Sequence, residues 1–237
     1  IAPPGATLNG YADGTAVNAD LVISNLQRNT SVAGSVMGSS TINGAVEASV
    51  ESLVNGAVAL SDNTITSSAT GNAARSALAS GTNAASFSGS AALANQQDNI
   101  TVGVTAINAG SSIEATAGSV QNSSVSVADN RSSASARGNE VGQSLSLDAT
   151  TLTLGGTVDL SSQANGLLQA NGMATVSNRQ VNTGTAVSAS NIASSIGQRA
   201  VAVTGPTLSV TGNTQDAVAL ANNASNQLNL TGTTVSG

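Results

Sequence analysis

The chain has 237 residues, of which 8% are charged and 1% aromatic, and its net charge is −6, with neither Cys nor His. Its six basic residues are all Arg and are scattered, which argues against nucleic-acid binding. No apolar run approaches the roughly 20 residues of a membrane-spanning helix, and without His, Lys or Cys the chain lacks a tuned base or nucleophile for neutral pH. We therefore expect no enzyme, no cofactor and no membrane span.

Hydrophobic residues make up 40% of the chain, which distinguishes it from a disordered low-complexity segment. Its Val, Leu and Ile recur at alternate positions, as in strands with one buried face. So little charge and so few aromatics fit a thin interior of small side chains between stacked strands. The predicted fold class is all-β, a β-solenoid of stacked short strands.

Residues 1–18 contain Pro, Gly and Asn and are predicted to form an irregular N-terminal arm. Leu8, Tyr11 and Val17 are the residues of this arm that we expect to contact a neighbouring subunit. Residues 19–237 are predicted to form a single β-solenoid domain.

Strand-like runs alternate with turn signals from Leu21 onward. Ile100-x-Val102-x-Val104 has period 2, and Leu145-x-Leu147 repeats the pattern further along the chain. Pro occurs only at positions 3, 4 and 206, so nearly all of the domain can donate ladder hydrogen bonds. Ser, Thr, Asn and Gly interrupt every Ala-rich stretch, which disfavours helix.

A short phrase recurs along the chain, in which aliphatic residues are followed by Asn. The intervals between these Asn residues are 26 to 35 residues, an irregular repeat of roughly 32 residues. Stacked Asn side chains can form amide ladders along the axis of such a fold. The predicted turn and ladder residues are Asn29, Asn63, Asn95, Asn130, Asn165, Asn191 and Asn222.

Three Asp-Asn steps begin at Asp62, Asp98 and Asp129. If these steps stack, their carboxylates would form a column able to bind Ca²⁺ through oxygen atoms. The alternative is that Asp and Asn bond to the local backbone in turns. The sequence leaves this choice open, and no metal site is predicted.

A second phrase, in which small residues lead into Gly-Asn, resembles the curlin repeats of bacterial curli fibres. It occurs as Gly71-Asn72 and as Gly138-Asn139, the latter followed by Gln143. The longer phrase from Asp129 to Leu147 is similar to surface proteins that anchor the holdfast of stalked bacteria, with holdfast attachment protein D as the nearest family. This resemblance implies a β-solenoid on the bacterial cell surface.

A second resemblance is to the heads of trimeric autotransporters, carried by the strand Asp98-Asn99-Ile100-Thr101-Val102-Gly103. These two resemblances lead to two function classes. The first is a structural subunit of an extracellular filament or adhesion anchor that polymerises head-to-tail. Its partners would be copies of itself, together with a surface polysaccharide or an anchoring protein. The alternative is a monomeric or trimeric adhesin head that binds a glycan or protein through its Ser/Thr/Asn-rich face.

Overall fold

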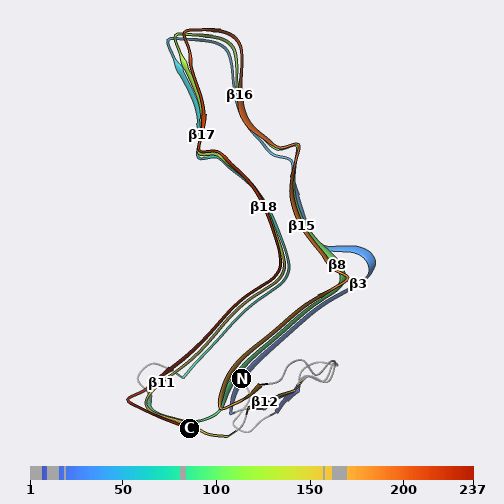
Figure 1. Cartoon of the computed structure of the whole chain (residues 1–237), viewed down its shortest axis with the longest axis vertical. Coiled ribbons are helices and arrows are strands. Elements are labelled where there is room, and N and C mark those ends of the chain that lie inside the picture. Colours follow the sequence, from blue (N-terminus) through green and yellow to red (C-terminus); the bar gives the residue numbers. More distant parts are fainter. Residues whose placement is uncertain (1–6, 10–15, 19, 81–83, 157, 162–169) are drawn as a thin grey trace.

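The computed structural model describes residues 7–9, 16–18, 20–80, 84–156, 158–161 and 170–237. Its described elements are all β-strands, which confirms the all-β prediction. The chain follows one path three times, and in Figure 1 the three courses run side by side. We call these courses the first pass (20–89), the second pass (90–156) and the third pass (173–237).

Each pass contains the same series of strands. The first pass holds β3 (Leu21–Ile42), β4 (Ala45–Val54), β5 (Ala57–Ser61), β6 (Thr64–Ala79) and β7 (Ala84–Gly89). The second pass holds β8 (Ala91–Ala109), β9 (Ser112–Gln121), β10 (Ser124–Ala128) and β11 (Arg131–Leu154). The third pass holds β14 (Ala174–Thr183), β15 (Ala186–Ile192), β16 (Ser195–Thr204), β17 (Thr207–Thr211), β18 (Thr214–Thr231) and β19 (Thr234–Ser236).

Equivalent strands of successive passes pair in parallel and in register. Val125 in β10, for example, lies between Val58 in β5 and Leu208 in β17. Residues stacked in the first and second passes are mostly 67 or 70 positions apart, and those in the second and third are 83 apart. The wider second interval contains the inserted strands β12 (Val158–Ser161) and β13 (Ala170–Gly172).

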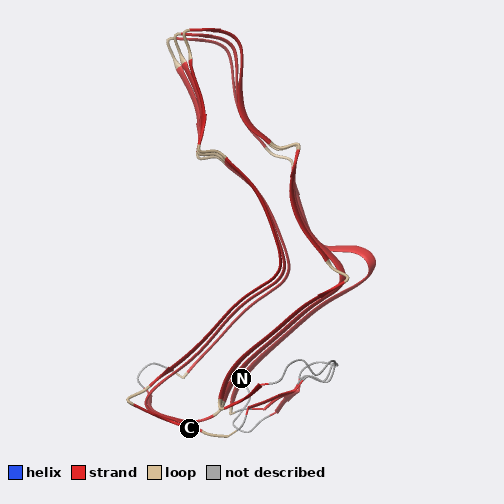
Figure 2. Cartoon of the chain, in the orientation of Figure 1, coloured by secondary structure: helices blue, strands red, loops and turns tan. Residues whose placement is uncertain are grey.

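These intervals are about twice the predicted repeat of 32 residues. Each pass has an outgoing side and a return side, which meet at the end of the molecule near β16 and β17 (Figure 2). Among the described residues, the recurring Asn phrases fall alternately on the two sides, with Asn29 in β3, Asn95 in β8 and Asn191 in β15 on the outgoing side. The predicted interval therefore measures half a pass, and it is not the distance between stacked strands.

A small antiparallel sheet lies beside the three passes. It joins β1 (Thr7–Asn9) and β2 (Ala16–Asn18) to β12 and β13. The arm that we expected to be irregular thus contains two short strands, and β2 pairs with β12 of its own chain. Leu8 and Val17 are register partners in this sheet, and Tyr11 lies outside the described residues.

The core fills the space between the outgoing and return sides. Inward side chains alternate with outward ones, as in β8, where Val102, Val104 and Ala106 are buried. Near the middle of the pass the two sides meet through Ala134 and Ala136, and elsewhere through Val and Leu. Because these side chains are short, the interior has no need of the aromatic residues that the composition lacks.

Two corners of the path are built from stacked residues with positive φ. One column contains Asn55, Asn122 and Gly205, with φ of 51°, 46° and 61°. The other contains Asp62 and Asp129, at 58° and 56°, followed in the third pass by Gly212 at 64°. Asn, Asp and Gly are the residues that most readily adopt this conformation. Two of the three Asp-Asn steps are therefore turns.

The order of the passes predicts a graded response to truncation of one core column. Leu78, Leu145 and Leu228 occupy equivalent positions, and Leu145 is fully buried whereas Leu228 is 44% exposed. We expect Leu145→Ala to lower the free energy of unfolding by about 2–5 kcal/mol. Leu228→Ala should cost less than about 1 kcal/mol, because its side chain is already half in water. Urea denaturation of monomeric protein measures both, and equal losses would contradict the stacking order.

Candidate functional site: an amide ladder and two open edges

Six Asn side chains form a ladder where the two sides of each pass come close together. Asn29, Asn99 and Asn182 come from the outgoing side, in β3, β8 and β14. Asn72, Asn139 and Asn222 come from the return side, in β6, β11 and β18. We call these six residues the amide ladder. It crosses the interior of the molecule through all three passes.

The amide ladder is bonded in one direction only. The Nδ2 atoms of Asn29, Asn72, Asn99 and Asn139 each donate to the Oδ1 atoms of the next two Asn residues in chain order. Asn99, for example, donates to Asn139 at 3.0 Å and to Asn182 at 2.9 Å. The nine bonds of this kind measure 2.8 to 3.2 Å. Chains of hydrogen bonds with a common direction strengthen one another through polarisation.

The Gly that precedes two of these Asn residues allows the passes to approach. A Cβ on Gly71 would lie 2.6 Å from the carbonyl oxygen of Gly138, and a Cβ on Gly138 would overlap the carbonyl oxygen of Ala221. This close contact gives the Gly-Asn phrase its physical reason. The third pass departs from the phrase, because Ala221 precedes Asn222 there.

The two ends of the amide ladder are incomplete in opposite ways. Inner ladder oxygens each accept from two preceding Asn residues, whereas Asn29 Oδ1 accepts from none and Asn72 Oδ1 from one. At the other end, Asn182 donates to one ladder Asn, and Asn222 Nδ2 turns back to the carbonyl oxygen of Gln180 at 3.4 Å. Compared with the inner members, three Asn–Asn bonds are therefore missing at each end. They are missing on the acceptor side in the first pass and on the donor side in the third, where Asn182 Nδ2 also donates to the carbonyl oxygen of Ala221 at 2.8 Å.

Further amide columns flank the ladder. Asn25, Asn95 and Asn178 are bonded in series in the same direction, as are Asn63, Asn130 and Asn213. A column of Gln27, Gln97 and Gln180 is bonded in the opposite direction, at 2.7 and 2.8 Å. Every one of these columns reaches both edges of the stack.

The predicted Asn residues fall in different columns. Asn29 and Asn222 belong to the amide ladder, Asn63 and Asn130 share a corner column, and Asn95 lies in the outgoing-side column beside the ladder. Asn191 accepts a bond from Asn108 at 2.9 Å. The remaining predicted residue, Asn165, lies outside the described residues.

Our choice of Asn residues from the recurring phrase missed four members of the amide ladder: Asn72, Asn99, Asn139 and Asn182. Three of them were visible in other phrases. Asn72 and Asn139 follow Gly in the Gly-Asn phrase, and Asn99 completes the Asp98-Asn99 step. Nothing in its local sequence marks Asn182.

Some charged residues of the described chain form ion pairs between passes. Asp98 is buried and bonds Arg28 of the first pass at 3.3 Å and Arg179 of the third at 2.7 Å. Arg131 bonds Asp216 at 2.9 Å, and the hydrogen bond that Arg131 donates to this carboxylate raises the pKa of Arg131 above its ordinary value. The third Asp-Asn step is thus part of an ion pair, apart from the corner that holds Asp62 and Asp129.

Within the part of the chain that the structure describes, no group of three or more acidic, His or Cys side chains is arranged to hold a metal ion. The same residues contain no helix of the length and apolarity needed to cross a membrane.

The third-pass edge exposes side chains that the second pass buries. Val203, Leu208, Val210, Leu228, Leu230 and Val235 are 39–52% exposed. Their second-pass partners are 0–2% exposed: Val120, Val125, Val127, Leu145, Leu147 and Leu152. These third-pass side chains face the interior, and what they lack is a following pass.

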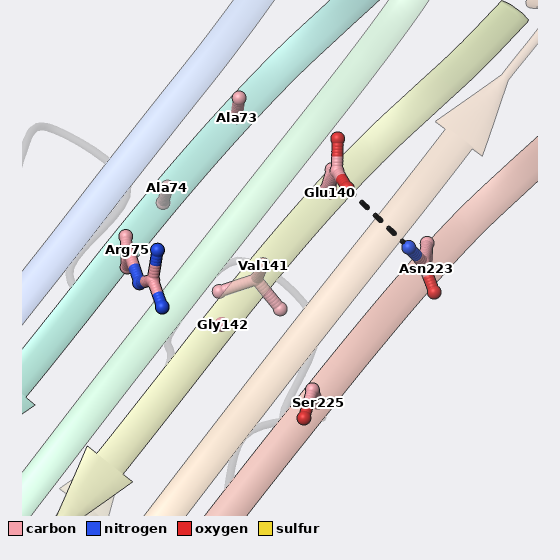
Figure 3. Close-up of a pocket in the computed structure, with 8 residues that line it drawn as sticks. All are labelled: Ala73, Ala74, Arg75, Glu140, Val141, Gly142, Asn223 and Ser225. Carbon is pink, nitrogen blue, oxygen red and sulfur yellow. Dashed lines mark hydrogen bonds between the residues drawn. The ribbon is translucent and has the colours of Figure 1, made fainter.

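A groove of about 600 Å³ crosses the three passes on the return side. Its lining includes Arg75 from β6, Glu140 from β11 and Asn223 from β18 (Figure 3). Asn223 Nδ2 lies 3.5 Å from Glu140 Oε1, and Arg75 has no ion-pair partner among the described residues. The groove therefore presents both donors and acceptors to solvent.

No protein-family model, curated protein or solved structure matches the chain.

The amide ladder predicts unequal effects of one substitution at its centre and at its end. Asn99→Ala removes a fully buried amide that bonds Asn29, Asn72, Asn139 and Asn182. Because buried groups are left unpaired, we expect a loss of about 2–4 kcal/mol of folding free energy. Asn222→Ala, at the solvent-exposed end, should cost below about 1 kcal/mol. Thermal and urea unfolding test this contrast, and a mild effect of Asn99→Ala would show that the ladder does not hold the passes together.

Proposed function

We propose that the chain is a β-solenoid subunit of an extracellular bacterial filament or surface-adhesion anchor, and that its copies polymerise head-to-tail by β-stacking. The third-pass edge of one copy would lie on the first-pass edge of the next. Strand edges of this kind carry unpaired N–H and C=O groups that favour pairing with another chain. A contact between two different edges is heterologous, and it yields a filament when the rotation between copies does not close a ring.

The observation that carries this proposal is the complementarity of the two ends of the amide ladder. The Oδ1 atoms of Asn29 and Asn72 in a following copy would accept the three further ladder bonds of Asn182 and Asn222, two at Asn29 and one at Asn72. The same contact would supply the three missing donors of Asn29 and Asn72. Unsatisfied polar groups buried between two copies would be costly, and this match avoids them.

The flanking columns support the same junction. Continued in register, the third pass would place Asn178 on Asn25, Gln180 on Gln27 and Asn213 on Asn63. Each amide would therefore meet an identical amide in the next copy. Identical side chains stacked in register are a feature of cross-β assemblies.

Burial of the exposed apolar row supplies a driving force for stacking. The interior side chains of the third pass would be covered by Leu53, Val58, Leu60, Leu78 and Phe87 of the next first pass. All five are apolar, so the contact would continue the core of the molecule. Apolar burial contributes about 25 cal/mol for each Å² removed from water.

Ala221 shapes the junction at one corner. Within the molecule, a Cβ added to Gly71 would meet the carbonyl oxygen of Gly138, and a Cβ added to Gly138 would meet that of Ala221. The methyl group of Ala221 would meet the carbonyl oxygen of the next copy's Gly71 in the same way. The junction must therefore be wider at this corner than the interval between passes.

The composition is compatible with a cell-surface setting. A chain without Cys does not depend on the redox state of its compartment. The outward faces are rich in Ser, Thr and Asn, which suits contact with a surface polysaccharide or an anchoring protein. The groove beside Arg75, Glu140 and Asn223 favours a second candidate function, an adhesin head that binds a glycan without polymerising.

Two lysine substitutions at the third-pass edge separate these functions. Val210 is 46% exposed and faces the interior, whereas Val218 is 41% exposed and lies in register with the outward Ser135. Both variants should fold as monomers, because both side chains reach water. Stacking would bury a lysine introduced at position 210 but not one introduced at position 218. We therefore expect Val210→Lys to abolish filaments and Val218→Lys to retain them. Negative-stain electron microscopy and a sedimentation assay measure the difference.

The unchanged chain provides the reference for this experiment. Filaments from the unchanged chain and from Val218→Lys, but not from Val210→Lys, would support the junction. Persistently separate particles of the unchanged chain would contradict the filament proposal and favour the adhesin head. Equal assembly by both lysine variants would place the contact elsewhere than on the open edges.

A further inference from the structure

An acidic pair on the first pass and a single Arg on the third occupy the same part of the path. Glu47 and Glu51 lie in β4, and Arg199 lies in β16. All three are exposed, and none has an ion-pair partner within the described part of the chain. The same column adds a further acid, because Glu114 of β9 is the register partner of Glu47. Like charges placed directly opposite one another are destabilising.

The register fixes where Arg199 would lie on a following copy. Arg199 pairs with Thr116, and Thr116 pairs with Ser49. Continuing this column past the third pass places Arg199 on Ser49 of the next copy. On that next copy, Glu51 lies two residues after Ser49 and Glu47 lies two residues before it. With strands about 4.8 Å apart and a rise of about 3.3 Å per residue, such diagonal Cα atoms are about 8 Å apart, within reach of an Arg side chain.

The molecule already contains two ion pairs with this diagonal geometry. Arg131 is in register with Thr214 and bonds Asp216, two residues ahead. Arg179 is in register with Gln96 and bonds Asp98, also two residues ahead. Glu51 has the same relation to Arg199 across the junction. The contact thus follows a pattern that the chain uses between its own passes.

We propose that Arg199 of one copy forms an ion pair with Glu51 and Glu47 of the next, and that this pair sets the register and direction of stacking. The inference rests on the head-to-tail contact proposed above and names its specificity-determining residues. Stacking also brings Arg179 within two residues of the next copy's Arg28, but both are bonded to Asp98 of their own chains. If one copy were shifted along the strands or inverted, Arg199 would no longer lie near Glu47 and Glu51 of the next copy. The attraction between these opposite charges would then be lost.

Complementary charge reversals provide the test. Arg199→Glu alone brings three acidic groups together at each junction, and Glu47→Arg/Glu51→Arg alone brings three basic groups together. We expect each variant by itself to have a critical concentration for assembly at least about tenfold above that of the unchanged chain. An equimolar mixture should assemble nearly as well as the unchanged chain, because alternating copies restore opposite charges at every junction.

Arg75→Glu is the matched control. It makes the same change of charge on the first pass, where the facing residue of the preceding copy would be Ser225. Its critical concentration should stay within about threefold of the unchanged value, and 1 M NaCl should reduce the difference between Arg199→Glu and the unchanged chain. Thermal unfolding of each monomer shows whether the substitutions disturb folding.

The outcomes distinguish the two proposals. Rescue on mixing supports the ion pair, since two misfolded variants would not restore one another. Filaments of the unchanged chain together with normal assembly of Arg199→Glu overturn the ion pair and leave the filament proposal standing. Impaired variants that fail to recover on mixing also overturn the ion pair. Absence of filaments from the unchanged chain overturns both proposals.

Discussion

The structure depends on hydrogen-bonded columns that run across the strands, from one pass to the next. Backbone ladders form part of these columns, and buried amide side chains form the rest. Asn99 and Asn139 are fully buried, and each donates a hydrogen bond to the equivalent Asn of the adjoining pass. A slip of one residue would turn each of these amides toward the other face of its strand. In-register stacking is thus what allows an interior with polar side chains to exist.

The unusual composition follows from this constraint. Two strands that approach closely enough for amide contact leave room for Ala and Val between them, as at Ala134 and Val104. Larger apolar side chains such as Leu145 and Leu147 occur where the sides diverge. Charged residues are few because each outward side chain lies close to the equivalent side chain of the adjoining pass. A charge repeated in successive passes would therefore bring like charges together. Some of the charged residues, such as Arg131 and Asp216, pair between passes.

The strand content could be predicted from sequence because alternation is local. Ile100 to Val104 and Leu145 to Leu147 carry the period of a half-buried strand within a few residues. The pairing distance could not be predicted in the same way. The outgoing and the return side of a pass both carry the motif of aliphatic residues followed by Asn. The spacing of this motif therefore indicates a repeat about half as long as the interval between stacked residues. Asn182 was missed because its role is set by Asn99, 83 residues earlier, and by no feature of its neighbours.

Under the proposed head-to-tail stacking, the two open edges are the two halves of one contact, and the axial order of a filament is the decisive quantity. Fibre diffraction from aligned filaments of the unchanged chain measures this order. We predict a reflection near 4.8 Å along the filament axis and an axial repeat of about 14 Å, the height of three passes. Filaments whose strand spacing lies across the axis, or whose repeat does not correspond to three passes, would contradict head-to-tail stacking through the edges.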